Sequence, residues 1–573
     1  MDNISILSRI KNKITSNLCA IGVIAIVLIS FWIRLTPWNL VFQPNGQILF
    51  GTNDAWYHMR VLGTLLQNYP NRMFYNPWTA YPYGSTIHFG PLFEQMIAIP
   101  ALILGLGHPS EQLINTIGAL LPAILGAFIS IPVYYIGKYV GDRKLGLIAA
   151  LLIAVTPGQL MSRSVLGFTD NHVAEVFYSS LFIMFFMASM HFAKEDKISF
   201  DNIFQKNLKP MRRTMFYAVM TGVAYAAYAL VWAGAPLFAF IVCVYGLVQY
   251  IINNIRGEHS DYVGITGIVT FFIGTLLVLP AIHTDIGFAQ DFYSWFTITV
   301  TLGAMIGFIV LSIVERVLQK QKFAGYYYPI VILVIGLIGL FVVSLISPNM
   351  YDVIVSTPNL IFAVNTGGPS TIAEGSSIFY MLTGTFNFDG VFANFTVIGF
   401  GVSILMLFVL PILIVKENRP TVTLLWVWGI LMLLAIYGQN RFAYYYSVYV
   451  ALAEAYLSMM LLDKANYQDI ADKIKKGIKT GERIPDTLKN IRLELVLVLF
   501  VIMGGFVYNS YNAAIPYTHG TIDPDQGWMD ACTWLNASTP QEGMDFNALY
   551  TAPTNGSLFD YPSTAYGVMS WWD

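Results

Sequence analysis

Charged side chains are scarce in this 573-residue sequence. Asp, Glu, Lys and Arg together make up 11% of it, whereas a soluble globular protein carries about 25%. Hydrophobic residues make up 56%, and the mean hydropathy is +0.59. This composition excludes an ordinary water-soluble domain and predicts a protein that lies in a lipid bilayer.

Cysteine is also rare. The three cysteines, Cys19, Cys243 and Cys532, lie far apart, and the first two fall in apolar segments. This spacing excludes a fold held together by a framework of disulfides. The sequence also lacks an internal repeat and a low-complexity tract.

Long apolar segments organise the chain. A membrane-spanning helix needs roughly 20 apolar residues, and the pattern predicts an all-α polytopic protein with about thirteen such helices. The predicted spans are 18–35, 112–137, 144–157, 173–193, 214–231, 235–253, 262–282, 294–315, 326–347, 393–415, 421–437, 442–462 and 493–511. We interpret the further apolar run 91–107 as a helix that lies on the membrane.

Positive charge is distributed unevenly about these spans. With thirteen spans, all but five of the 31 Lys and Arg residues fall on the side of the N-terminus; the exceptions are Arg34, Arg60, Arg72, Arg163 and Arg441. Loops rich in Lys and Arg stay in the cytoplasm. The sequence from Leu493 onward contains no Lys or Arg, so we expect it to end outside.

Residues 1–511 form the predicted membrane domain, with long external loops at 36–111 and 348–392. Residues 512–573 begin an external domain, and so short a segment rarely sustains a core by itself. We therefore expect that domain to be incomplete. The internal segment 463–492 is rich in lysine and is predicted to be a helix on the anionic membrane surface.

Polar residues of the external loops are the candidates for function. Asp54 precedes an amphipathic segment that ends near Gln67, and Asp170 precedes His172 at the entrance of the fourth span. Either aspartate suits a helix N-cap. An ionisable ring such as His172 is costly at the start of a span and is usually functional. Carboxylate and imidazole together suit Mn²⁺, with Mg²⁺ also possible.

Three further groups lie on the same predicted side. Glu374, in Thr371-Ile372-Ala373-Glu374, stands in a glycine-flanked loop that suits a closing lid. Arg441 and Arg163 either extend to lipid headgroups or hold an anionic phosphate. Trp571 and Trp572 precede Asp573 far beyond the last span, where an interfacial aromatic belt is less expected.

In this order the motifs resemble the catalytic subunit of oligosaccharyltransferase, most closely the single-subunit archaeal type. The matching segments are Asp54, Ser162-Arg163-Ser164 with Asp170-Asn171-His172, Thr371-Ile372-Ala373-Glu374, Arg441-Phe442-Ala443-Tyr444-Tyr445-Tyr446, and Trp571-Trp572-Asp573. The resemblance covers essentially the whole chain. It implies a GT-C type glycosyltransferase in the cell membrane, with its active site on the external face.

The resemblance also implies roles. The enzyme moves an oligosaccharide from a dolichol phosphate or pyrophosphate carrier to the asparagine of Asn-x-Ser/Thr, with inversion. Asp54, Asp170 and His172 would hold Mn²⁺ or Mg²⁺, while Asp54 and Glu374 would bind the acceptor amide. The expected partners are the lipid-linked donor, the acceptor polypeptide and membrane lipids, without nucleic acid or obligate protein subunits.

Two residue sets complete the expected site. Arg441, together with Arg163, would bind the lipid phosphate, and Trp571, Trp572 and Asp573 would recognise the acceptor hydroxyl. Tyr and Gly follow this triplet in the family but are absent here. We expect either a fragment or a short paralogue that binds metal and donor but transfers poorly.

Two other functions fit parts of the pattern. A glycosyltransferase with a dolichol-phosphate monosaccharide donor shares the multi-span plan, but it needs neither Glu374 nor the terminal tryptophans. A secondary transporter places its ionisable residues near the bilayer midplane, whereas these lie in external loops.

Four sequons are present. We expect Asn3 (internal) and Asn394 (beside a span) to stay bare, whereas Asn536 and Asn555 are available.

Overall fold

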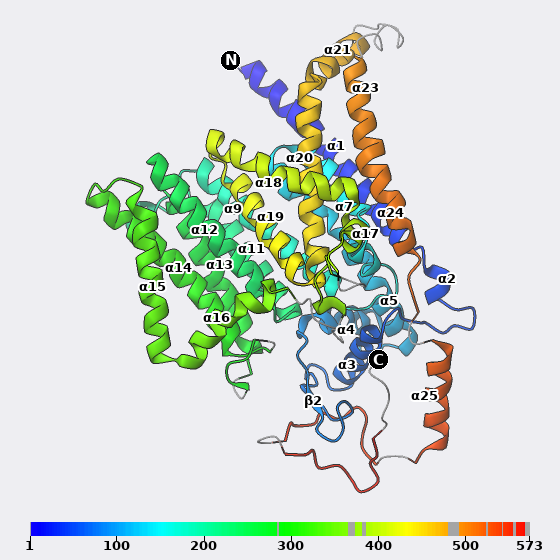
Figure 1. The fold of residues 1–573 in the computed structure, drawn as a ribbon. Helices are drawn as coiled ribbons and strands as arrows, with labels where there is room; N and C mark the ends of the chain where they lie inside the picture. Colours follow the sequence, from blue (N-terminus) through cyan, green and yellow to red (C-terminus); the bar gives the residue numbers. More distant parts are fainter. Residues whose placement is uncertain are drawn as a thin grey trace.

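The computed structural model describes residues 2–283, 286–290, 292–364, 373–380, 385–479, 492–522, 525–540, 543–553 and 557–567. Nearly all regular structure in this part of the chain is helical (Figure 1). A single two-stranded antiparallel sheet pairs β1 (Tyr75–Asn76) with β2 (Ser85–Thr86) among the described residues. The all-α membrane fold predicted from hydropathy is confirmed.

Twelve helical segments of the described chain are long and apolar enough to cross a membrane. They are α1 (Asp2–Arg34, apolar from Asn17), α5 with α6 (Glu111–Phe128 and Ser130–Val140), α9 (His172–Glu195), α11 (Arg212–Val231), α12 (Pro236–Arg256), α13 with η1 (Asp261–Val278 and Leu279–Ala281), α14 (Trp295–Lys320), α15 (Tyr327–Ile346), α18 (Val397–Glu417), α19 (Pro420–Gly438), η4 with α20 (Asn440–Phe442 and Ala443–Lys464), and α23, η5 and α24 (Leu493–Phe500, Val501–Tyr508 and Asn509–Thr518).

The remaining predicted span, 144–157, is the third in chain order and corresponds to the short helix α7 (Arg143–Ala154). Asp142 caps its start by accepting hydrogen bonds from two backbone N–H groups at 2.9 Å. Lys144, near that start, contacts Tyr467 of α21 (Tyr467–Lys479). Arg163, beyond the other end, pairs with Glu374 of the second long loop. The segment from Lys144 to Arg163 therefore runs from one end of the bundle to the other, although α7 lacks the length of an ordinary span.

The core lies where the central helices pack together. The span Asn440–Lys464 is the most buried, with 83% of its apolar window inside the protein, whereas Tyr327–Ile346 has none buried. Helix α9 packs against α11, and α20 packs against α7 and α18. Helix α15 stands at the margin of the bundle in Figure 1. Its exposed leucines and isoleucines suit contact with lipid.

Shorter helices occupy the connections. They are α2 (Trp38–Val41), α3 (Asn53–Gln67), α4 (Leu92–Leu104), α8 (Gln159–Ser162), α10 (Phe200–Phe204), α16 (Pro348–Phe362), η3 (Ala373–Gly375), α17 (Asp389–Phe395) and α25 (Gln526–Ser538). Helices α3, α4 and α25 gather at one end of the molecule in Figure 1, and α21 lies at the other. We call these the site end and the opposite end.

Several boundaries differ from the sequence prediction. The run 91–107 forms the 13-residue helix α4, which is too short to span. The loop 348–392 begins as helix α16, so its first part has regular structure. The last span continues to Thr518 instead of ending at residue 511. All three cysteines are free, as their spacing predicted.

Described residues after α25 pack against the first long loop, 36–111, which we call loop 1. Tyr75 of β1 forms a bridge with Tyr550. The Arg60 guanidinium stacks on the Phe546 ring, 3.4 Å from its centroid, and the Asn68 side chain donates to the Asn547 carbonyl at 2.8 Å. Loop 1 and the described part of residues 543–567 therefore form a joint surface at the site end.

Candidate active site

Helix α3 brings Asp54 to the site end. Its N-cap is Thr52, whose hydroxyl accepts from the Ala55 N–H at 3.2 Å. Asp54 therefore lies in the first turn and does not cap, so the capping role that the sequence also allowed is wrong. The surrounding protein raises the pKa of the Asp54 carboxyl, and so does the negative charge of Asp170. A cation placed between the two carboxylates would relieve this repulsion.

A close backbone contact holds loop 1 against the segment that carries the second acid. The Gly51 N–H donates to the Gly167 carbonyl at 2.9 Å. Gly167 adopts φ +86°, and a Cβ there would lie 2.7 Å from the Val41 side chain. Only glycine fits this backbone conformation and this space. The chain that follows, 168–171, leads directly into α9.

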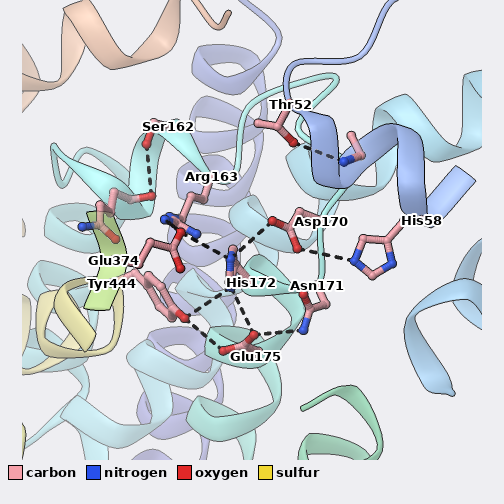
Figure 2. A network of polar contacts seen from close by, with 12 residues as sticks. Thr52, His58, Ser162, Arg163, Asp170, Asn171, His172, Glu175, Glu374 and Tyr444 are labelled. Atoms are coloured by element: carbon pink, nitrogen blue, oxygen red, sulfur yellow. Dashed lines mark hydrogen bonds and ion pairs between the residues drawn. The ribbon is translucent and has the colours of Figure 1, made fainter. Parts of the chain in front are cut away.

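Asp170 lies between two imidazole rings at the start of α9 (Figure 2). Its Oδ1 is 3.6 Å from His58 Nε2, and its Oδ2 is 3.3 Å from His172 Nε2. The adjacent residue Asn171 occupies the N-cap position, so Asp170 does not cap α9 either. Burial opposes ionisation of Asp170, but the His172, His58 and Arg163 side chains hold its pKa well below the usual range.

His58 is buried on α3, one turn after Asp54. Its Nδ1 lies 2.9 Å from Glu94 Oε1, and Arg72 Nη2 lies 3.8 Å from the other oxygen of Glu94. Burial disfavours the charged ring, but attraction to the Asp170 and Glu94 carboxylates outweighs it and raises the pKa of His58 to about 9. Arg72 and His58 together lower the pKa of Glu94 despite its burial.

His172 has a different partner on each ring nitrogen. Its Nδ1 lies 3.1 Å from Glu175 Oε1 and 3.3 Å from the Tyr444 hydroxyl, while its Nε2 faces Asp170. A metal-binding histidine commonly donates one ring N–H to a carboxylate and uses the other nitrogen as the ligand. The arrangement of His172 matches that pattern.

Glu374 of the second long loop lies against Arg163 and His172. This residue lies in η3, and its carboxylate forms an ion pair and hydrogen bond with Arg163 (Figure 2). His172 Nε2 is 3.8 Å from Glu374 Oε1. Burial opposes ionisation of Glu374, but His172 and Arg163 lower its pKa. Thr371 and Ile372 of the same motif lie outside the described residues.

Arg441 lies in η4, just before α20. Its guanidinium stacks on Trp232 at 5.2 Å from the ring centroid. Arg441 Nε is buried and has no hydrogen-bond partner among the described residues. Tyr444, three residues later, lies beneath Arg163, whose guanidinium is 5.4 Å from the ring. Arg163 therefore contacts a tyrosine that follows Arg441 by three residues along the chain.

The structure brings together most, but not all, of the predicted site. Asp170, His172, Arg163 and Glu374 are in direct contact. Asp54 forms no ion pair with His172 in the described part of the chain, and no group of three His, Cys, Asp or Glu side chains there has the spacing of a metal cluster. Trp571, Trp572 and Asp573 lie outside the described residues, as do Asn555 and the side chain of Asn3.

Sequence reasoning missed three contributors, namely His58, Glu94 and Glu175. His58 follows Asp54 by four residues and Glu175 follows His172 by three, spacings that place each pair on one helix face. This periodicity could have identified both residues. Glu94 had no such signal, because only tertiary packing brings α4 against α3.

Comparison with protein families shows to which family the chain belongs. The family model for oligosaccharyl transferase STT3, N-terminal, matches residues 18–504. The chain belongs to the STT3 oligosaccharyl transferase family. A second model, the AglB core domain, matches residues 525–573.

Curated relatives agree with the STT3 assignment. Dolichyl-phosphooligosaccharide-protein glycotransferase 3 of Archaeoglobus fulgidus is 29% identical over 563 residues, which cover 95% of this chain and 61% of the relative. A dolichyl-monophosphooligosaccharide–protein glycotransferase of Haloferax volcanii is 27% identical and covers 96% and 58%, respectively. The chain thus spans about three fifths of the length of these relatives.

Solved structures show the same fold. The archaeal oligosaccharyltransferase of Archaeoglobus fulgidus, in complex with an inhibitory peptide and a dolichol-phosphate, superposes with a TM-score of 0.86 at 27% identity, covering 97% of this chain and 63% of that one. The Archaeoglobus fulgidus oligosaccharyltransferase with Zn and sulfate gives a TM-score of 0.75 at 25% identity, covering 96% and 60%. The STT3 chain described here is therefore a polytopic membrane protein with the GT-C fold that its sequence predicted.

Proposed function

We propose that this chain contains the metal-binding and donor-binding catalytic half of an oligosaccharyltransferase. The reaction is transfer of an oligosaccharide from a dolichol phosphate or pyrophosphate to the asparagine of Asn-x-Ser/Thr, at the external face of the cell membrane. The observation that carries the proposal is that Glu374 of the second long loop contacts Arg163 and His172, while Asp170 contacts His172, in an STT3 chain.

The site suits a divalent ion held by Asp170, His172 and Asp54. His172 Nε2 and Asp170 Oδ2 face each other at 3.3 Å. Burial and the negative charge of Asp170 both raise the pKa of the Asp54 carboxyl. Oxygen and nitrogen donors together are compatible with Mn²⁺, and Mg²⁺ is the second candidate. Such an ion would supply Lewis acidity toward the departing phosphate.

Arg441 is the proposed binding group for the lipid phosphate. Its ring contact with Trp232 orients the guanidinium, and its Nε–H is left without a partner among the described residues. A planar guanidinium binds phosphate oxygens with two parallel hydrogen bonds. Arg163 would contribute to the same positive region, since both arginines contact or adjoin Tyr444.

Glu374 and Asp54 are the proposed partners of the acceptor amide. An amide nitrogen is a weak nucleophile because its lone pair is delocalised into the carbonyl. Carboxylates that accept hydrogen bonds from the N–H groups weaken this delocalisation while the nitrogen attacks the anomeric carbon from the face opposite the phosphate. Trp571, Trp572 and Asp573 are proposed to bind the acceptor hydroxyl, which would reject peptides without one.

The first experiment measures binding of dolichyl phosphate to the full chain in lipid nanodiscs by native mass spectrometry, with and without Mn²⁺. We expect saturable binding that Arg441→Ala abolishes. Arg213→Ala is the matched control, because Arg213 is a half-exposed arginine that pairs with Glu195 and Asp196 far from the site. Equal binding by the wild type and the Arg441 variant would refute the donor site.

A second experiment tests the reaction class. A fluorescent Asn-x-Thr peptide and dolichol-linked oligosaccharide are incubated with the chain, and a gel shift reports transfer. We expect slow transfer that requires metal and is lost in Asp170→Asn, with a Gln-x-Thr peptide as the negative control. Transfer of a single sugar from a dolichyl-phosphate monosaccharide instead would establish the alternative glycosyltransferase.

A further inference from the structure

A buried glutamate next to the site has no role in the reaction proposed above. Glu175 lies in the first turn of α9 and is fully inaccessible to solvent. An ionisable group at this position in a membrane protein is costly unless it is paired and hydrogen-bonded. Its partners therefore indicate what it does.

Four polar side chains contact the Glu175 carboxylate, and Figure 2 shows Asn171, His172 and Tyr444 among them. Oε1 accepts from the Asn171 side chain at 3.0 Å and lies 3.1 Å from His172 Nδ1. Oε2 accepts from the Tyr444 hydroxyl at 3.1 Å and from the Tyr445 hydroxyl at 2.6 Å. An ionised carboxylate has about four lone-pair positions, so this set of donors saturates it.

The arrangement determines which nitrogen of His172 carries hydrogen. The Asn171, Tyr444 and Tyr445 side chains all donate to Glu175, so its contact with His172 Nδ1 favours the tautomer in which that nitrogen carries hydrogen. In the neutral ring the lone pair is then on Nε2, the atom that faces Asp170 at 3.3 Å. A carboxylate behind the ring also increases the basicity of the ligating nitrogen.

Glu175 also connects the metal side of the site to the phosphate side. Tyr444 and Tyr445 open α20, immediately after Arg441 in η4. The Tyr445 hydroxyl makes a further hydrogen bond of 2.9 Å to the Tyr228 hydroxyl of α11. One carboxylate thus joins the starts of α9 and α20 and, through Tyr445, the end of α11.

We propose that Glu175 is a positioning residue that holds His172 in the tautomer and orientation needed to bind a divalent ion, and that ties this ligand to the segment that carries Arg441. The inference rests on the proposed metal site. It assigns Glu175 no contact with the ion, the donor or the acceptor. Its effect is therefore expected on metal affinity and not on the fold alone.

The test measures Mn²⁺ affinity of the full chain in lipid nanodiscs by electron paramagnetic resonance. Glu175→Gln keeps the shape but removes the charge, and it should weaken Mn²⁺ binding about 10- to 100-fold, the usual cost of losing such a partner. Glu454→Gln is the matched control, because Glu454 is also a buried glutamate in a span, and its Oε1 has no hydrogen-bond partner among the described residues. The control should bind Mn²⁺ as the wild type does.

Metal-free melting temperatures separate positioning from a purely structural role. We expect the Glu175 and Glu454 variants to melt at similar temperatures without metal, and only the wild type and the Glu454 variant to gain stability from Mn²⁺. If Glu175→Gln does not fold, Tyr445→Phe replaces it. That change removes the 2.6 Å hydrogen bond but leaves the carboxylate, and it should weaken Mn²⁺ binding by a smaller factor.

Failure of the Glu175 proposal can be distinguished from failure of the proposed metal site. If Asp170→Asn weakens Mn²⁺ binding but Glu175→Gln and Tyr445→Phe do not, the role of Glu175 is refuted and the metal site stands. If the wild type binds Mn²⁺ no better than Asp170→Asn, the proposed metal site fails, and the inference about Glu175 fails with it.

Discussion

The Arg163 guanidinium forms an ion pair with the Glu374 carboxylate, 211 residues further along the chain. Arg163 follows α8 in the interior of the bundle, whereas Glu374 belongs to the second long loop. Because Arg163 is proposed to bind phosphate and Glu374 to bind the acceptor amide, the pair joins the two substrates' binding groups. Each would have to exchange its present partner when substrates bind.

We predict that Glu374→Gln lowers the turnover of peptide transfer by about 100-fold, the scale of one positioned polar group acting on reacting atoms. Binding of dolichyl phosphate should not weaken, since the change releases Arg163 from its partner. Turnover is measured by gel shift at saturating donor, and binding by native mass spectrometry. A loss of donor affinity with unchanged turnover would show that Glu374 serves the donor instead.

Gly158 is predicted to tolerate no side chain. It adopts φ +72°, and a Cβ there would lie 2.4 Å from both Cα and Oδ1 of Asn394. Gly158→Ala should destabilise the chain by about 1–3 kcal/mol from backbone strain alone and displace α8, which leads to Arg163. Gly63→Ala, in α3 with open space around it, is the control and should be neutral or slightly stabilising. Thermal unfolding in nanodiscs measures both, and equal melting of the two variants would contradict the prediction.

Asn394 is predicted to carry no sugar although it stands in a sequon. The sequence suggested that the nearby membrane would prevent its use, but the structure supplies a more direct reason. Its side chain is 7% exposed, accepts from the Gln159 N–H at 2.8 Å and donates to the Gly390 carbonyl at 2.8 Å. Asn536, on α25, is exposed. Glycopeptide mass spectrometry of the folded chain should find sugar on Asn536 and not on Asn394, and a modified Asn394 would disprove this packing.

Arg60 is predicted to hold the end of the described chain on loop 1. Arg60→Ala removes the stacking on Phe546 and the hydrogen bond to the Phe546 carbonyl. The loss of about 1 kcal/mol expected for a cation–π contact should speed chymotryptic cleavage near Phe546 about fivefold, if the segment opens locally before it is cut. Lys144→Ala, which removes a similar contact with Tyr467 at the opposite end, should leave this cleavage rate unchanged.

Much of the fold could be predicted because hydropathy is a local property. Each span is recognisable from its own 20 or so residues, whatever it packs against. Reasoning from local sequence is weakest at the residues where a helix begins or ends. It allowed Asp54 or Asp170 to act as an N-cap, whereas Thr52 caps α3 and Asn171 takes the cap position of α9. Helix α7 shows that hydropathy is also a limited guide to membrane spans. The contacts of Lys144 and Arg163, and not the length of α7, indicate that the chain passes between the two ends of the bundle there.

The sequence by itself determined the membrane class, the approximate spans and several of the charged residues proposed for the site, because composition and motif order do not depend on packing. Only the tertiary structure decided how those residues pair. Asp170 lies between His58 and His172, Glu374 reaches Arg163, and Glu175 collects four hydrogen bonds from two helices and the turn before one of them. Such contacts join residues far apart along the chain, and a buried polar group is stable only where its partners converge in space.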